Sequence, residues 1–150
     1  MVANHENDLA NPEWLQSRVG LRAHILLADD DAEMRILLAF TLRSEGYEVV
    51  ECPDGTQLLE QLKIACAPNA LQRVDLIITD MRMPGISGLE VLRRVCNHRG
   101  MPPIILITAF GDEQTHIQAR QLGAAASIDK PFEITCFLEL VHTLVSSPHR

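Results

Sequence analysis

The sequence predicts a doubly wound α/β fold, in which helices cover both faces of a five-stranded parallel sheet and form a three-layer sandwich. Five short apolar runs, each bounded by polar or turn residues, are too short for helices and are typical of strands buried on both faces. A segment with apolar residues at helical spacing follows each run, so strand and helix alternate. Five such units with right-handed crossovers favour the strand order 2-1-3-4-5.

The first half of the chain contains two strand–helix units and a third strand. The run HILLAD is followed by a helical segment that Gly46 ends, and the run YEVVEC is followed by a PDG turn and a second helical segment. The third run, VDLIITD, ends at Asp80. The expected strands span 24–29, 47–52 and 74–80, and the expected helices span 32–46 and 56–67. The apolar faces of these helices are expected to contain Met34, Leu37, Leu38, Thr41, Leu42, Leu58, Leu59, Leu62 and Cys66.

The second half continues the alternation. The helix GLEVLRRVCNHRG is closed by Gly100, and the strand PPIILITAF follows it. The helix GDEQTHIQARQLG then leads to a weaker fifth strand, AAASID, and to the last helix, EITCFLELVHTLVSS. The expected helices span 88–100, 111–123 and 133–147, and the expected strands span 102–110 and 124–129. The apolar side of the last helix is expected to contain Ile134, Phe137, Leu138, Val141, Leu144 and Val145.

We expect one domain, residues 23–147, because 150 residues suit a single core of ordinary size. Residues 1–22 are polar and irregular. Their stretch NPEWLQSRVG favours a short helix, with Asn11 as its N-cap and Pro12 in its first turn, and a flexible extension is the alternative. Residues 148–150 are expected to form a tail.

The composition argues against several function classes. The net charge is −7 and the basic residues form no dense block, which argues against nucleic acid held on a basic surface. No apolar run has membrane-spanning length and no signal-peptide pattern opens the chain, so a cytoplasmic protein without membrane contact is expected. The four cysteines lack CxxC spacing and are expected to be buried free thiols, and no histidine pair has the spacing of a zinc site.

Polar groups gather where the predicted strands end. In a doubly wound sheet, ligands bind beyond the carboxyl ends of the strands, at the point where the strand order reverses. Two carboxylates about 4 Å apart repel by roughly 4 kcal/mol at an effective dielectric constant of about 20, so a compensating cation is expected among them. Oxygen ligands without histidine or cysteine suit Mg²⁺ or Mn²⁺. The strand-end residues are Asp29, Asp30, Asp31, Asp80, Thr108 and Lys130.

This set of groups is suited to taking up a phosphoryl group on an aspartate. A carboxylate can act as the nucleophile, a divalent ion and Lys130 can neutralise phosphoryl oxygens, and the Thr108 hydroxyl can donate a hydrogen bond. The chain contains neither GxxxxGK[ST] nor GxGxxG, so a nucleotide-binding loop has no support. The third carboxylate of the run, Asp31, is expected to face solvent or to cap the following helix.

Four stretches contain these residues in the expected order: LLADDDAEMR, IITDMRMPGISGLE, LITA and DKPF. Through them the sequence closely resembles the receiver domain of two-component response regulators, the CheY-like domain with its flavodoxin-like fold. The resemblance extends over about residues 23–147. It implies that Asp80 accepts the phosphoryl group, that Thr108 is the switch hydroxyl, and that Lys130 pairs with phosphate oxygens.

The same resemblance implies a Mg²⁺ site. Asp30 would bind the ion directly, and Asp29 would reach it mainly through water. Asp80 and the backbone carbonyl of Arg82 would complete the protein ligands. The resemblance also implies a cis peptide bond between Lys130 and the proline that follows it.

The resemblance further implies a signalling receiver rather than an enzyme, whose only reactions are its own phosphorylation and dephosphorylation. A histidine kinase or a histidine phosphotransfer protein would donate the phosphoryl group, and an output protein would bind the face of the fourth helix, fifth strand and fifth helix. Neither a DNA-binding nor a catalytic domain follows, so we expect output through protein binding, or a receiver that is part of a longer regulator. A phosphorelay shuttle and a phosphorylation-independent docking module are the alternatives, and phosphorylation-linked dimerisation stays open.

Two features depart from the family pattern. Ser127 stands three residues before the lysine, where the family often has an aromatic residue, so Phe110 or the following helix is expected to report phosphorylation instead. Arg82 and Phe110 flank the phosphoryl position, and because neither readily orients an attacking water, slow self-dephosphorylation is expected. The helical histidines expected at the surface are His98, His116 and His142.

Overall fold

The computed structural model describes residues 22–109 and 112–146, which form one sheet of five parallel strands in the order β2-β1-β3-β4-β5. This confirms the predicted fold class and strand order. The predicted helix in the N-terminal extension and the tail at 148–150 lie outside the described residues. The strands are β1 (His24–Ala28), β2 (Glu48–Cys52), β3 (Leu76–Asp80), β4 (Ile104–Ala109) and β5 (Ala126–Lys130). The helices are α3 (Ala32–Ser44), α4 (Gly55–Ala65), α5 (Gly88–Val95), α6 (Glu113–Gln121) and α7 (Ile134–Ser146).

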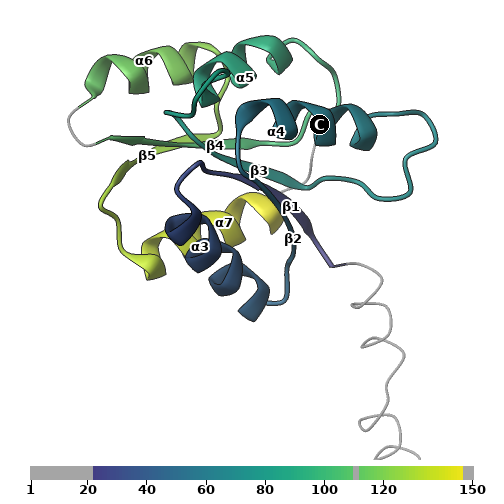
Figure 1. Cartoon of the computed structure of the whole chain (residues 1–150), viewed down its shortest axis with the longest axis horizontal. Coiled ribbons are helices and arrows are strands. Elements are labelled where there is room, and N and C mark those ends of the chain that lie inside the picture. Colours follow the sequence, from purple (N-terminus) through teal and green to yellow (C-terminus); the bar gives the residue numbers. More distant parts are fainter. Residues whose placement is uncertain (1–21, 110–111, 147–150) are drawn as a thin grey trace, which may run out of the picture.

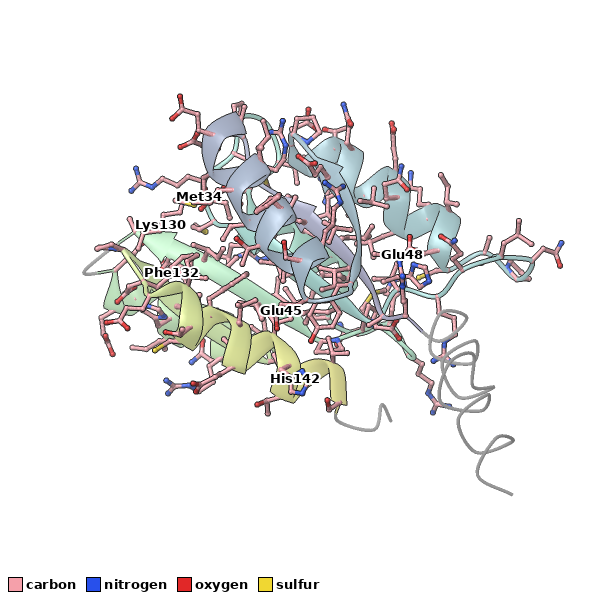
Figure 2. All side chains as sticks on the ribbon, turned by 90° about the horizontal axis from the view of Figure 1, so that it is seen from below. Met34, Glu45, Glu48, Lys130, Phe132 and His142 are labelled. Carbon is pink, nitrogen blue, oxygen red and sulfur yellow. The ribbon has the colours of Figure 1, made fainter. Side chains whose placement is uncertain are left out.

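The helices form two layers, one on each face of the sheet. α3 and α7 cover one face, and α4, α5 and α6 cover the other (Figure 1). Figure 2 shows α3 and α7 side by side on the first face, where Leu38 and Phe137 pack in one buried apolar cluster. Leu58 of α4 and Leu92 of α5 belong to a second cluster on the other face. The sheet therefore separates two apolar cores, as a three-layer sandwich requires.

The strands are almost continuously apolar because both of their faces are covered. In β1, Ile25 belongs to the core under α3 and α7, whereas Leu26 belongs to the core under the other three helices. The parallel pairing of β1 with β3 brings the residues after β1 and the last residue of β3 to the same edge of the sheet. Asp29 and Asp80 consequently become neighbours although they lie far apart in the sequence.

Polar side chains begin four of the helices at this edge. The side chains of Asp31, Asp54, Ser87 and Asp112 accept hydrogen bonds from backbone N–H groups in the first turns of α3, α4, α5 and α6. Each cap stabilises its helix by about 1 kcal/mol. Asp31 is thus the helix cap that the sequence predicted, and its role differs from that of the two aspartates before it.

Most element boundaries differ from the prediction by one or two residues, and the end of one helix differs by five. α5 ends at Val95 and not at Gly100, which lies in a turn with a φ of 76°. Residues 96–100 are exposed, so no buried contact stabilises a further helical turn. β3 begins at Leu76 rather than at residue 74.

Two predictions that side chains would be buried are wrong. Leu37 is 50% exposed, although its spacing placed it on the apolar face of α3. Among the four free cysteines, Cys52 is buried, but Cys66, Cys96 and Cys136 are exposed. A side chain that stands among apolar residues in the sequence is still exposed when it lies on the solvent side of its helix or at the helix end.

Candidate active site

Three carboxylates from two neighbouring strands meet at the carboxyl edge of the sheet. Asp29 and Asp30 follow β1, Asp80 ends β3, and one oxygen of each side chain lies within 4.8 Å of the others. Asp29 and Asp80 are buried, with 1% and 7% of their surface exposed, whereas Asp30 faces solvent. The structure thus brings together the acidic residues that the sequence predicted as neighbours.

Lys130 enters this cluster from the end of β5. Its Nζ lies 2.9 Å from Asp80 Oδ1 and 3.7 Å from Asp29 Oδ2. Only 30% of the lysine side chain is exposed, so the ion pair with Asp80 is partly shielded from water. The peptide bond to Pro131 is cis, as the resemblance implied. One ammonium group faces three carboxylates, which leaves an excess of negative charge in the cluster.

Burial controls the ionisation of these groups. Removal from water raises the pKa of Asp29 and the pKa of Asp80, and nearby carboxylate charges raise both further. Lys130 acts in the opposite direction on both carboxyl groups. Burial lowers the pKa of Lys130, but the hydrogen bond and charge of Asp80, together with the charges of Asp29 and Asp31, outweigh burial, so the lysine pKa lies above its usual value. The carboxylates therefore pay a desolvation cost that a further cation would reduce.

The donor set fits a divalent, oxygen-preferring cation such as Mg²⁺. Asp29 Oδ2 is buried and has no hydrogen-bond partner among the described residues, an unfavourable state for a carboxylate oxygen. A hollow of about 370 Å³ lies beside the cluster, and its walls include Asp30, Arg82 and Ser87. Arg82 stands in the loop directly after β3, as the prediction of its carbonyl as a ligand requires. Carboxylate oxygens next to an open hollow would hold the ion and leave room for water or phosphate oxygens.

The backbone around Asp29 is held by an arginine that the sequence reasoning missed. Arg35, in the first turn of α3, donates from Nη1 to the carbonyl of Asp29 at 2.8 Å. Its Nε also pairs with Glu51 of β2 at 3.2 Å, so α3 is tied to two strands. The Asp31 N–H donates to Asp29 Oδ1 at 2.9 Å and orients that carboxylate. The spacing of an arginine six residues after an aspartate contains no signal that would have indicated this contact.

The loop after Asp80 is packed closely against the strand that it leaves. The N–H of Gly88 donates to the carbonyl of Met81 at 2.9 Å, and the N–H of Met81 donates to Ile107 of β4 at 2.7 Å. A Cβ added to Gly88 would lie 2.3 Å from the backbone oxygen of Asp80, which is closer than atoms can approach. Glycine at this position therefore allows the start of α5 to rest directly on Asp80.

Thr108 lies at the predicted strand end, but its hydroxyl points toward β5. The residue is 1% exposed and sits near the end of β4. Its Oγ1 donates to Asp129 Oδ1 at 2.7 Å and also lies 3.3 Å from the carbonyl of Ile128. In this structure the Thr108 hydroxyl is therefore hydrogen-bonded to β5.

The prediction that His116 is a surface residue is wrong. Only 15% of its side chain is exposed, and its ring contacts Thr108, Ser127 and Asp129. His142 is exposed as predicted, and His98 is exposed but lies beyond the end of α5. The helical spacing of α6 did not reveal the contact, because the nearest partners of His116 lie on two other elements. Asp129 was also missed, although it stands directly before Lys130.

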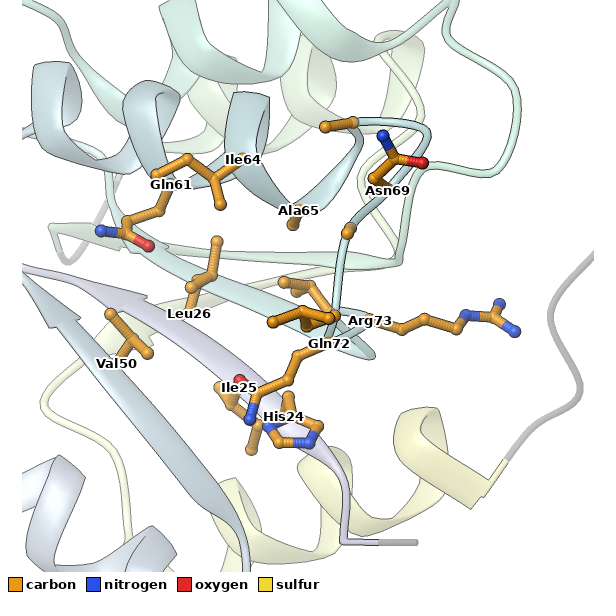
Figure 3. A pocket seen from close by; sticks show the side chains of 14 residues that line it. His24, Ile25, Leu26, Val50, Gln61, Ile64, Ala65, Asn69, Gln72 and Arg73 are labelled. Carbon is orange, nitrogen blue, oxygen red and sulfur yellow. The ribbon is translucent and has the colours of Figure 1, made fainter. Parts of the chain in front are cut away.

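A second hollow lies at the opposite end of the sheet, away from these groups. Its volume is about 530 Å³, and it lies between the start of β1, the end of α4 and the loop that precedes β3 (Figure 3). Leu26, Ile64 and Val74 give it a largely apolar wall. The acidic residues, Thr108 and Lys130 are not among its lining residues, so it has no part in the chemistry described above.

The comparison with known proteins agrees with this geometry. The family model described as the response regulator receiver domain matches residues 25–142. The chain belongs to this family. The chain is 35% identical over 123 residues to the transcriptional regulatory protein PdtaR of Mycobacterium tuberculosis, an alignment that covers 81% of this chain and 56% of PdtaR.

Two further relatives match most of their own length. Sporulation initiation phosphotransferase F of Bacillus subtilis is 33% identical over 110 residues, which cover 73% of this chain and 83% of that protein. The crystal structure of a response regulator receiver domain protein from Clostridium thermocellum superimposes with a TM-score of 0.73 at 28% identity, and it covers 82% of this chain and 94% of that one.

The chain spans about half the length of the first relatives it matches, 56% for PdtaR and 51% for FixJ of Bradyrhizobium diazoefficiens. Both are named transcriptional regulatory proteins. The expectation that nucleic acid is not a partner therefore stays a prediction about these residues. Within the described ranges, every helix is too short or too polar to span a bilayer.

Proposed function

We propose that Asp80 of this receiver takes its phosphoryl group from a phosphohistidine of a histidine kinase or a histidine phosphotransfer protein. The observation that carries the proposal is the convergence of charges on Asp80. Lys130 lies 2.9 Å from this carboxylate, and the neighbouring Asp29 Oδ2 lacks a hydrogen-bond partner among the described residues. Such a site has a nucleophilic oxygen, a fixed positive charge and an unsatisfied oxygen for a cation.

In the proposed reaction, a carboxylate oxygen of Asp80 attacks the phosphorus while the P–N bond to the donor imidazole breaks. The imidazole leaves with the bonding electron pair and is protonated by solvent. Mg²⁺ bound by Asp29, Asp30, Asp80 and the Arg82 carbonyl would neutralise charge on the transferring oxygens. Lys130 lowers the pKa of Asp80 against the effect of burial, which favours the ionised carboxylate, and is placed to pair with phosphoryl oxygens afterwards.

The test is phosphorylation by acetyl phosphate, with intact-mass spectrometry as the readout. The wild type with Mg²⁺ is expected to gain one phosphoryl adduct, and both Asp80→Asn and the wild type in EDTA are expected to gain none. Asp31→Asn is the matched control, because Asp31 belongs to the same acidic run but caps α3, a role that asparagine also fills. It should be phosphorylated like the wild type.

A folded wild type that gains no adduct from acetyl phosphate or from phosphohistidine donors would contradict the proposal. The phosphorylation-independent docking module would then be the better assignment. An adduct that persists on Asp80→Asn would place the phosphoryl group on another residue.

A phosphorelay shuttle is the second candidate, because a relative of similar length is named a phosphotransferase. A shuttle passes its phosphoryl group on to a second histidine protein, whereas a terminal receiver keeps it until hydrolysis. Incubation of the phosphorylated chain with isolated histidine phosphotransfer domains separates the two functions. Transfer of the phosphoryl group to such a domain within minutes would favour the shuttle.

We propose that output occurs through α6, β5 and α7. The contacts of Thr108 support this surface, because they lead to Asp129 on β5 and His116 on α6. A change in the position of the Thr108 hydroxyl would therefore alter contacts on β5 and α6. Light scattering of the phosphorylated and unphosphorylated chain tests whether the face pairs two copies or is left for a different protein.

Slow self-dephosphorylation is a further expected property of this site. Arg82 is exposed beside Asp80, and a guanidinium group cannot accept a proton from an attacking water. Phe110, the second residue invoked, lies outside the described residues. Arg82→Asn should accelerate the loss of the adduct several-fold, because an amide oxygen can hold a water in line with phosphorus. The decay of the adduct after removal of acetyl phosphate measures this, and equal decay of both proteins would contradict it.

A further inference from the structure

The Thr108 hydroxyl belongs to a network of side chains that joins β4, α6 and β5. Thr108 Oγ1 lies 2.7 Å from Asp129 Oδ1 and 3.2 Å from His116 Nε2. His116 Nε2 also contacts Asp129 Oδ1, and His116 Nδ1 contacts the Ser127 hydroxyl. One carboxylate oxygen is therefore shared between the threonine and the imidazole.

The strand register places these groups on one side of the sheet. Thr108 pairs with Asp129 across β4 and β5, and Ser127 stands two residues before Asp129 on the same face of β5. α6 covers this face, and His116 in its first turn reaches both residues. The histidine thus contacts Thr108 from α6 in a chain that has Ser127 where the family pattern often has an aromatic residue. The Ser127 hydroxyl contacts the other ring nitrogen and orients the ring.

The proton positions follow from the charge of Asp129. Hydrogen bonds from Thr108 and His116 hold the pKa of Asp129 below its usual range, so the carboxylate is ionised and only accepts. The single hydroxyl proton of Thr108 goes to this oxygen, its shortest contact. His116 must then carry a proton on Nε2 in order to donate to it, and in the neutral ring Nδ1 accepts from Ser127.

We propose that His116 is a positioning residue, which acts through Asp129 to set the resting position of the Thr108 hydroxyl and to transmit phosphorylation to α6. The inference rests on the proposed function, since Thr108 has a reason to move only when Asp80 carries a phosphoryl group. To reach that group, Thr108 must release Asp129. His116 then remains as the donor to Asp129, so the carboxylate keeps a partner. Asp129 opposes the movement, and His116 makes it easier.

Substitutions of Asp129 and His116 are therefore expected to act in opposite directions. The probe is beryllofluoride with Mg²⁺, a stable analogue of a phosphoryl group on a carboxylate, and its affinity is measured by titration calorimetry. Asp129→Ala should bind the probe more tightly, because Thr108 is released. His116→Leu should bind it more weakly, because Asp129 then depends on Thr108 alone. Each change should be about tenfold, the scale of one hydrogen bond to a charged group.

Conservative variants separate positioning from general damage. His116→Gln keeps an N–H donor close to the position of Nε2 and should restore most of the wild-type affinity. His116→Asn reaches only the position of Nδ1 and should resemble His116→Leu. His142→Leu is the matched control, because His142 contacts the Tyr47 hydroxyl at 3.2 Å. Figure 2 shows His142 near one end of α7 and Phe132 near the other end. His142→Leu should not change the affinity.

Nitrogen-15 NMR of the histidine rings gives a readout that does not need phosphorylation. The neutral His116 ring should carry its proton on Nε2, and Asp129→Ala should shift this signal. A proton on Nδ1 instead, or affinities of Asp129→Ala and His116→Leu that change in the same direction, would overturn the inference.

Failure of the inference and failure of the proposed function give different results. If the wild type binds beryllofluoride and all variants bind it equally, the receiver function stands and the role of His116 is wrong. If the folded wild type neither binds beryllofluoride nor gains an adduct, the proposed function is wrong and the transmission role falls with it. The position of the ring proton still decides whether the resting network exists.

Discussion

Gly88→Ala is expected to destabilise the protein by about 1–3 kcal/mol, the usual cost of overpacking a core. The sign of this change in stability is informative, because replacing a helical glycine with alanine ordinarily stabilises a protein by roughly 0.5–1 kcal/mol. The added Cβ would lie 2.3 Å from the backbone carbonyl oxygen of Asp80 and 2.9 Å from Leu106 Cδ1. Leu106 is fully buried and Asp80 ends a central strand, so neither atom can move away freely. α5 or the Asp80 backbone must shift.

The measurement is urea unfolding, combined with the acetyl phosphate assay. Gly85→Ala is the control for backbone strain, because Gly85 has a φ of 79° but no atom lies within 4 Å of an added Cβ. It should cost about 1–2 kcal/mol and leave phosphorylation of Asp80 intact. Gly88→Ala should lower both stability and the rate of phosphorylation. A Gly88→Ala protein as stable as the wild type would show that α5 does not rest on the end of β3 as described.

Asp80→Asn is expected to make the metal-free protein more stable at neutral pH, by about 1–3 kcal/mol. Burial raises the pKa of Asp80, so the ionised side chain is less favourable in the folded protein than in the unfolded chain. The substitution removes this charge and its repulsion of the neighbouring carboxylates. It also removes the main partner of Lys130, but Asp29 Oδ2 lies 3.7 Å from the lysine and has no other partner among the described residues.

The pH dependence of this difference has a definite sign. A carboxyl group with a raised folded-state pKa costs stability above that pKa, and the cost disappears as the pH falls toward the ordinary value of 3.8. The raised pKa of Asp29 acts in the same sense, but Asp29 is present in both proteins. The advantage of Asp80→Asn should therefore be largest at pH 7 and should shrink as the pH is lowered toward about 4.

Urea unfolding in EDTA at pH 7 and pH 5 measures the effect. Asp31→Asn is the charge-matched control, because Asp31 is exposed outside the cluster, and it should change stability by less than about 0.5 kcal/mol. Added Mg²⁺ should stabilise the wild type more than Asp80→Asn, since the ion binds the folded state through the missing carboxylate. A mutant that is less stable than the wild type in EDTA would show that the carboxylates are not clustered.

The architecture and the strand-end groups were predictable from the sequence. Buried strands such as LIITD are apolar on both faces, and the helices between them show the helical period, so each element is marked by local pattern. Parallel strands also end at a common edge. Asp29, Asp80, Thr108 and Lys130 could therefore be assigned to one crevice from their positions after four apolar runs, and the structure places all four at that edge.

Only the tertiary structure decided which of these groups touch. Local pattern defines the face of a helix, but a hydrogen bond between elements depends on strand register and helix placement to within an ångström. The Lys130–Asp80 contact, the Arg35 support of Asp29 and the seating of His116 against Thr108 all depend on that placement. Local sequence pattern determined that an acidic crevice would form, and the packing of α6 on β5 decided that Asp129 and His116 would surround the Thr108 hydroxyl.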